Sequence, residues 1–345
     1  MVGVVFRAAE CVTRRRGGGV IGLRRASLRA VLVAALASCV PGERDVPPGA
    51  IEPREGHVEV EPGVRLYYTA MGEGEPTVLV PAALFLLEPL RGLATGRTVL
   101  FYDMRDRGRS GAVEDTSRIG IRDDVRDLEA LRRHFGLDRI QLVGWSYLGL
   151  VAAMYAFEHP ERVERLVQIG PIPPRADPPY ADPGAYAAAV APDALERLRR
   201  LAEEGMPERE PARYYGEYWR VFKPALFGDT SVMRRYELPP ADLSNEWVNR
   251  LEPHFQAKFA SMGGYDWRHA AAGLSVPVLV VHGSADRNAP PAGGREWAVS
   301  FGNARFFGVD GAGHLPMVEQ PDLVLPVLDR FLSGTWPQGA VVLLH

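Results

Sequence analysis

The chain has 345 residues, of which 46% are hydrophobic and 24% charged, and its formal net charge is -3. This length and hydrophobic content suit one large α/β domain, or such a domain with an insertion. The lack of net positive charge argues against a nucleic-acid partner. The two cysteines, Cys11 and Cys39, lie near the N-terminus, and the eight histidines show no H-x-x-x-H spacing, so we expect no metal site and no cofactor.

The first 38 residues differ from the rest of the chain. A basic region that includes Arg24 and Arg25 precedes a short apolar run over 30–36, too short to span a bilayer but suited to a signal peptide. The sequence Leu36-Ala37-Ser38-Cys39 resembles the lipobox of bacterial lipoproteins, which implies cleavage before Cys39 and acylation of its thiol.

We therefore expect a signal peptide over 1–38 and a tether rich in Pro and Gly over 39–55. The protein would be exported to the cell envelope, and its one membrane contact would be the lipid anchor at Cys39. The alternative is a start codon assigned upstream of the true one, which would leave the protein cytoplasmic.

The body opens with a predicted hairpin, followed by apolar runs of strand length. Residues 57–60 and 64–68 alternate around Glu61-Pro62-Gly63, which is typical of a hairpin. Uninterrupted apolar runs indicate parallel strands that are buried on both faces. They lie at 77–80, 99–102, 140–143, 166–169, 276–281 and 304–307.

Helical patterns separate these strands. One of them contains Val125, Leu128 and Leu131 and is followed by Gly136, and the last begins after Pro321. Alternating strands and helices predict an α/β fold with a mostly parallel sheet and helices on both faces. We expect its core to comprise 56–170 and 274–334, with a helical lid over 171–273 inserted above the ligand-binding edge and a tail over 335–345.

Ser146 lies between the strand ending at Val143 and a helical run that follows it. A strand that turns directly into a helix at a serine must bend sharply, and the bend lifts the hydroxyl clear of the sheet. Such a serine can attack a carbonyl if a histidine takes its proton and a carboxylate orients that histidine.

Candidates for both partners follow strands later in the chain. Asp286 comes after the strand ending at Val281, and His314 comes after the next strand. These loops lie at the same edge of a parallel sheet as Ser146, so we predict a Ser146–His314–Asp286 triad, with Asp310 and Asp266 as rival acids.

Four motifs relate the body to a known family. They are Gly144-Trp145-Ser146-Tyr147, Gly283-Ser284-Ala285-Asp286, Gly311-Ala312-Gly313-His314 and the run Asp103 to Ser110. Over residues 56–334 the chain resembles the α/β-hydrolase superfamily, in particular the branch with proline iminopeptidases and related esterases. The resemblance implies an α/β-hydrolase fold and a serine hydrolase activity.

The chain departs from this family at two positions. The glycine usually found two residues after the nucleophile is Leu148, so we expect a slightly relaxed or shifted turn in which Gly149 compensates. The family's His-Gly-rich sequence after the third strand is Pro81-Ala82-Ala83-Leu84-Phe85. By correspondence with the family, the N–H groups of Ala83 and Tyr147 form the oxyanion hole.

Side chains of the predicted lid leave two interpretations open. Tyr215, Tyr218, Trp219, Trp247 and Trp267 either form the core of the lid or line a substrate pocket. Glu217 and Glu246 belong either to a solvated helix face or to a site for a substrate amino group.

The sequence therefore predicts a serine hydrolase that cleaves a small or medium carboxylic ester or amide through an acyl-enzyme. The nearest rival is an aminopeptidase of the proline iminopeptidase type that acts on short peptides. A non-catalytic binding protein on the same fold is the alternative from another class, and only the altered oxyanion sequence supports it.

Overall fold

The computed structural model describes residues 53–178, 180, 189–237, 254, 257–258 and 260–344. The predicted signal peptide, Cys39 and most of the tether lie outside the described residues, as do Glu246 and Trp247. No helix in the described part is long and apolar enough to cross a membrane.

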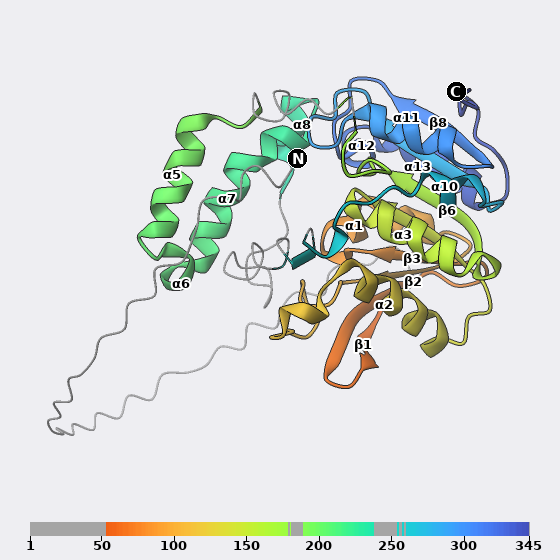
Figure 1. The fold of residues 1–345 in the computed structure, drawn as a ribbon, viewed down its shortest axis with the longest axis horizontal. Helices are drawn as coiled ribbons and strands as arrows, with labels where there is room; N and C mark the ends of the chain where they lie inside the picture. Colours follow the sequence, from red (N-terminus) through yellow and green to blue (C-terminus); the bar gives the residue numbers. More distant parts are fainter. Residues whose placement is uncertain are drawn as a thin grey trace, which may run out of the picture. The chain divides into compact units, whose positions relative to one another are not determined.

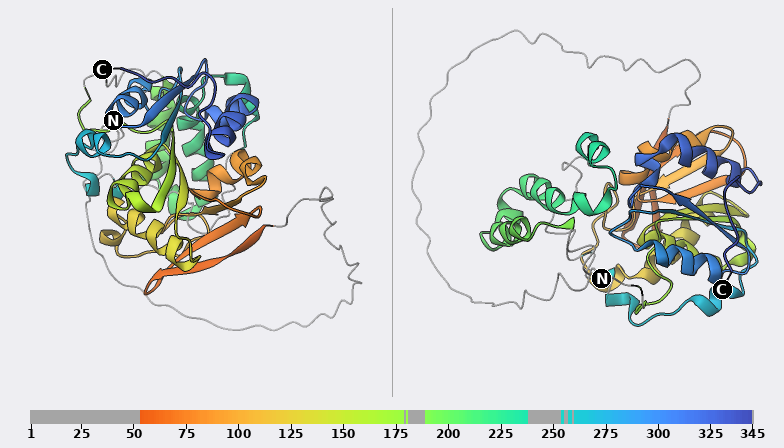
Figure 2. Two further views of the ribbon diagram at one scale, coloured as in Figure 1. Left: turned by 90° about the vertical axis from the view of Figure 1, so that its right-hand side faces the viewer. Right: turned by 90° about the horizontal axis from the view of Figure 1, so that it is seen from above.

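An eight-stranded sheet in the order β1-β2-β4-β3-β5-β6-β7-β8 forms the centre of the fold (Figures 1 and 2). The predicted hairpin, β1 and β2, is antiparallel at one end of the sheet, and β3 to β8 run parallel to one another. The predicted mostly parallel sheet with an N-terminal hairpin is therefore confirmed. The strands are β1 Arg54–Glu61, β2 Val64–Met71, β3 Thr77–Pro81, β4 Thr98–Tyr102, β5 Ile140–Trp145, β6 Val163–Ile169, β7 Val278–Gly283 and β8 Ala304–Val309.

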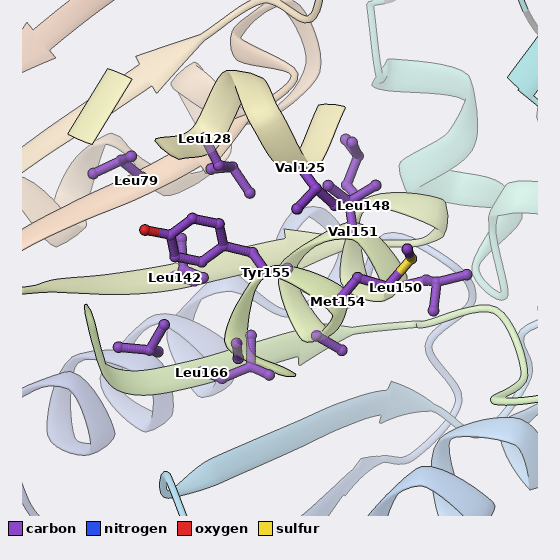
Figure 3. Close-up of a cluster of buried hydrophobic side chains, with 14 of the residues drawn as sticks. Leu79, Val125, Leu128, Leu142, Leu148, Leu150, Val151, Met154, Tyr155 and Leu166 are labelled. Carbon is purple, nitrogen blue, oxygen red and sulfur yellow. The ribbon is translucent and has the colours of Figure 1, made fainter. Parts of the chain in front are cut away.

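The strand side chains alternate between two apolar clusters, one on each face of the sheet. Leu79 and Leu142 face the first cluster, whereas Val78 and Val80 face the second. Figure 3 shows the first cluster where helices pack on β3, β5 and β6. Because both faces are buried, these strands are apolar at nearly every position.

Helices cover both faces, as predicted. Those that contribute to the first cluster are α2 Ile121–His134, α3 Tyr147–Glu158, α10 Arg268–Ala272 and α11 Pro291–Ser300, and those that contribute to the second are α1 Ala83–Leu90, α12 Pro316–Glu319 and α13 Pro321–Leu332. Helix α2 ends before Gly136, whose φ of 65° lies in the left-handed region that a helix C-terminus favours. Single 3₁₀ turns are η2 Arg91–Ala94, η3 Thr116–Arg118 and η4 Pro160–Arg162.

The segment between β6 and β7 contains further helices. They are α5 Pro192–Glu203, α6 Met206–Arg209, α7 Pro211–Leu226 and α8 Thr230–Arg235. Helices α5 and α7 lie side by side (Figure 1) and bury Leu198, Tyr215 and Val221 in a cluster of their own. Near the end of the same segment, Ala271 and Trp267 pack instead against the main core.

The C-terminal tail contacts the edge of the sheet. Val341 and Phe306 of β8 exchange backbone hydrogen bonds of 2.8 and 2.9 Å, which adds a single antiparallel bridge beside the last strand.

Candidate active site

Ser146 lies between β5 and α3, at the sharp bend that the sequence predicts. Its φ of 57° and ψ of -129° lie outside the regions that non-glycine residues favour. A Cβ on Gly144 would lie 2.3 Å from the carbonyl oxygen of Leu148, so the strand and helix backbones touch at that glycine. The Leu148 side chain is buried in the first cluster (Figure 3) and does not enter this contact. Close packing at the turn thus depends on Gly144, and the side chain of Leu148 is accommodated in the core without disturbing it.

Asp286 and His314 form a buried pair beyond the carboxyl ends of β7 and β8. The Nδ1 atom of His314 lies 2.7 Å from Oδ2 of Asp286. The other carboxylate oxygen accepts hydrogen bonds from the amides of Asn288 at 2.9 Å and Ala289 at 2.8 Å. Burial raises the pKa of Asp286, but His314 and a further histidine, His282, outweigh it and hold this pKa well below its usual range.

The two rival acids have other partners. Asp310 accepts a hydrogen bond of 3.0 Å from the hydroxyl of Ser284, and Asp266 pairs with Arg268. Asp286 is the carboxylate that contacts His314.

Trp145 links the Ser146 turn to the loop that carries His314. Its indole Nε1 donates a hydrogen bond of 2.8 Å to the carbonyl oxygen of His314, and the two rings lie 5.1 Å apart. Within the described part of the chain, Nε2 of His314 is buried without a hydrogen-bond partner. This nitrogen is therefore available to a hydroxyl or a substrate atom at the site.

Ala83 and Tyr147 supply the first N–H groups of α1 and α3, which begin at the ends of the adjacent parallel strands β3 and β5. Ala82, just before α1, has a φ of 65°. The carboxylate of Asp103 accepts hydrogen bonds from the amides of Leu84 at 2.9 Å and Arg109 at 3.0 Å, which fixes the start of α1. Two helix N-termini at one edge are suited to an oxyanion.

Asp124 of α2 joins the side chain of Tyr147 to Lys258, which lies in the segment between β6 and β7. The hydroxyl of Tyr147 donates a hydrogen bond of 2.7 Å to Asp124, and the other oxygen of Asp124 lies 2.6 Å from the ammonium of Lys258. Burial lowers the pKa of Lys258, although Asp124 opposes this effect.

A second buried ion pair joins the loop after β4 to α2. The guanidinium of Arg105 binds both oxygens of Asp127, at 2.8 and 2.6 Å, and also Glu61 at 2.8 Å. Arg105 and Asp103 thus stabilise loops.

Aromatic side chains connect the Ser146 turn to α7. The ring of Phe85 in α1 lies 5.8 Å from that of Trp145 and 5.7 Å from that of Trp219. Tyr215 and Tyr218 contact Trp219 in the cluster that α5 and α7 form. Glu217 pairs with Arg197 at 2.7 Å and also with Arg220.

Three polar residues at this site are not identified by the sequence analysis. They are His282 beside Asp286, Lys258, and Glu319, whose carboxylate binds the loop before His314. The sequence indicates His282 only by its position, because it is a polar residue directly after the apolar run Val278 to Val281. Among the described residues, no group of three or more His, Cys, Asp or Glu side chains could hold a metal ion.

Comparisons with known proteins agree with this architecture. A family model described as "alpha/beta hydrolase fold" matches residues 86–321, more than half of the chain. A proline iminopeptidase from Lactobacillus delbrueckii subsp. bulgaricus is 24% identical over 240 residues, which cover 66% of this chain and 77% of that protein. One from Saccharolobus solfataricus is 25% identical, over 74% of this chain and 82% of its own length. Among solved structures, a thermophilic esterase from Thermogutta terrifontis has a TM-score of 0.60 at 24% identity, with 82% of this chain and 98% of that chain covered.

Proposed function

The chain is a hydrolase that belongs to the α/β-hydrolase fold family, and from that premise we propose that it is a serine hydrolase of small or medium carboxylic esters or amides. The observation that carries the proposal is the 2.7 Å contact between His314 and Asp286, at the sheet edge where Ser146 occupies a strained turn. Strain of this kind is stored at functional sites.

The proposed reaction begins when the Ser146 hydroxyl attacks the substrate carbonyl carbon while Nε2 of His314 takes its proton. Asp286 accepts the hydrogen bond from Nδ1 and stabilises the imidazolium. The amides of Ala83 and Tyr147 donate hydrogen bonds to the oxyanion, and loss of one such donor typically costs about 3 kcal/mol of transition-state stabilisation.

The tetrahedral intermediate then expels the leaving group, which receives the proton from His314, and an acyl group remains on Ser146. Water attacks this acyl-enzyme with His314 again as general base. The carboxylic acid leaves, and the serine hydroxyl is restored.

Two substrate classes compete within this proposal. The half-buried rings of Phe85, Trp145 and Trp219 favour an ester or amide with an apolar group. Similarity to proline iminopeptidases favours a short peptide with an N-terminal proline. Glu217 is already paired with two arginines, so it is a poor candidate for binding a substrate amino group.

A comparison of two chromogenic substrates tests the choice. We expect kcat/KM for p-nitrophenyl butyrate to exceed that for proline p-nitroanilide by at least tenfold. The reverse ranking would assign the protein to the iminopeptidase class. The Ser146→Ala variant, assayed in parallel, corrects for spontaneous ester hydrolysis.

Export and lipid anchoring remain a proposal from the sequence alone. Cells that express the full chain with labelled palmitate should incorporate label into the wild type and none into Cys39→Ser. Equal incorporation into both would refute acylation of Cys39.

A further inference from the structure

A second imidazole, that of His282 at the end of β7, contacts the same carboxylate oxygen as His314. Its Nε2 lies 3.2 Å from Oδ2 of Asp286, compared with 2.7 Å for Nδ1 of His314. With the amides of Asn288 and Ala289 on Oδ1, the buried carboxylate has four nitrogen neighbours. The proposed proton transfer uses only one of them.

The surroundings of His282 determine which of its ring nitrogens carries hydrogen. Nε2 also lies 2.9 Å from the carbonyl oxygen of Ala289, and a carbonyl oxygen can only accept a hydrogen bond. The hydrogen is therefore on Nε2, where it is shared between Ala289 and Asp286. His282 thus donates to the oxygen that orients His314.

Helix α11 packs closely against the imidazole of His282. The His282 side chain is fully buried, and its Nδ1 has no hydrogen-bond partner in the described part of the chain. A Cβ on Gly294 would lie 2.3 Å from this Nδ1, so the ring fits only because residue 294 has no side chain. The neighbouring Gly293 does not face the ring, since a Cβ there would contact Pro173 at 3.3 Å.

We propose that His282 is a positioning residue, which fixes the Asp286 carboxylate and thereby the ring orientation of His314. The inference rests on the proposed serine hydrolase function. His282 contacts Asp286, and in this proposal it acts through that carboxylate alone. Buried donors to an orienting carboxylate restrict its rotation, so the base is already aligned before substrate binds.

Two substitutions at position 282 test the role of the donor. His282→Phe keeps ring volume and removes the N–H, and His282→Gln keeps an N–H at a similar distance from the backbone. For p-nitrophenyl butyrate we expect His282→Phe to lower kcat by about ten- to a hundredfold, the range for a lost hydrogen bond to a charged group, with KM within about threefold. His282→Gln should recover most of the loss, which a purely structural role for the ring would not explain.

A matched pair of variants in α11 tests the same idea with His282 intact. Gly294→Ala should displace the ring and lower kcat about tenfold, whereas Gly293→Ala should stay within about twofold of the wild type. If His282→Phe fails to fold, the difference in kcat between Gly294→Ala and Gly293→Ala still tests the positioning role. If the wild type is active and both His282→Phe and Gly294→Ala keep its kcat, the positioning role is refuted while the hydrolase remains. If the wild type hydrolyses no ester or amide, the proposed function fails, and the positioning role fails with it.

Discussion

Glu319 in α12 provides a sharp test of how the His314 loop is held in place. Its Oε1 accepts a hydrogen bond of 2.6 Å from the amide of Gly313, and its Oε2 accepts bonds of 2.9 and 2.7 Å from the amides of Gly228 and Asp229. The amide of His314 itself donates to the carbonyl oxygen of Leu226 at 2.8 Å. One carboxylate thus joins the loop before His314 to the chain that follows α7.

The cost of Glu319→Ala follows from the surroundings of these three amides. Gly313 is buried, so its amide would lose its acceptor in the interior, at a cost of about 1–3 kcal/mol. Gly228 is partly exposed and Asp229 is exposed, and water can replace the carboxylate at those amides. We expect a total loss of about 1–3 kcal/mol in the free energy of unfolding.

Urea unfolding and steady-state kinetics measure the two consequences of Glu319→Ala. The free energy of unfolding should fall by about 1–3 kcal/mol, and kcat should fall more than tenfold because the His314 loop is released. Glu319→Gln, which keeps one accepting oxygen, should lose about half as much stability. Asp322→Ala removes an exposed carboxylate at the start of the next helix and is the control, with an expected change below about 0.5 kcal/mol. If Glu319→Ala matched this control in stability and the wild type in kcat, the reasoning would be wrong.

Three further variants, one of them with a matched control, test other contacts of the core and the site. Asp127→Ala should lower the free energy of unfolding by about 3–5 kcal/mol in urea, because it leaves Arg105 buried without its bidentate partner; a loss below 1 kcal/mol would contradict this. Leu148→Ala should lower the free energy of unfolding by about 2–4 kcal/mol in the same assay, because its side chain packs in the core. Its kcat should stay within threefold of the wild type, because the side chain does not pack at the turn, and a larger loss of kcat would refute this assignment. In ester hydrolysis, Asp286→Asn should lower kcat by about 10³- to 10⁴-fold with KM nearly unchanged, whereas the control Asp310→Asn should keep the kcat of the wild type. The opposite pattern would assign the role of the orienting carboxylate to Asp310.

The sequence predicted the sheet and its edge well because both follow from local patterns. Apolar runs mark strands that are buried on both faces, and polar residues such as Asp286 and His314 come directly after them. Boundaries were less accurate. The run from Val276 predicted a strand two residues earlier than β7, which begins at Val278, after a proline whose nitrogen carries no hydrogen for the ladder.

The contacts around the site could not be predicted, because they join residues distant in the chain. Nothing near Lys258 indicates that its ammonium reaches Asp124, which in turn holds the hydroxyl of Tyr147. The same holds for Glu319 and the amides that follow α7. Their partners are set by tertiary packing, and no spacing within one element encodes them.

Covalent labelling with a fluorophosphonate probe tests the central claim most directly, since the probe reacts with a serine only when a general base activates it. Intact mass should show one adduct on the wild type, peptide mapping should locate it at Ser146, and Ser146→Ala should carry none. A wild type that takes up no probe, or a Ser146→Ala variant labelled as strongly as the wild type, would contradict the assignment and would favour a binding protein on the same fold.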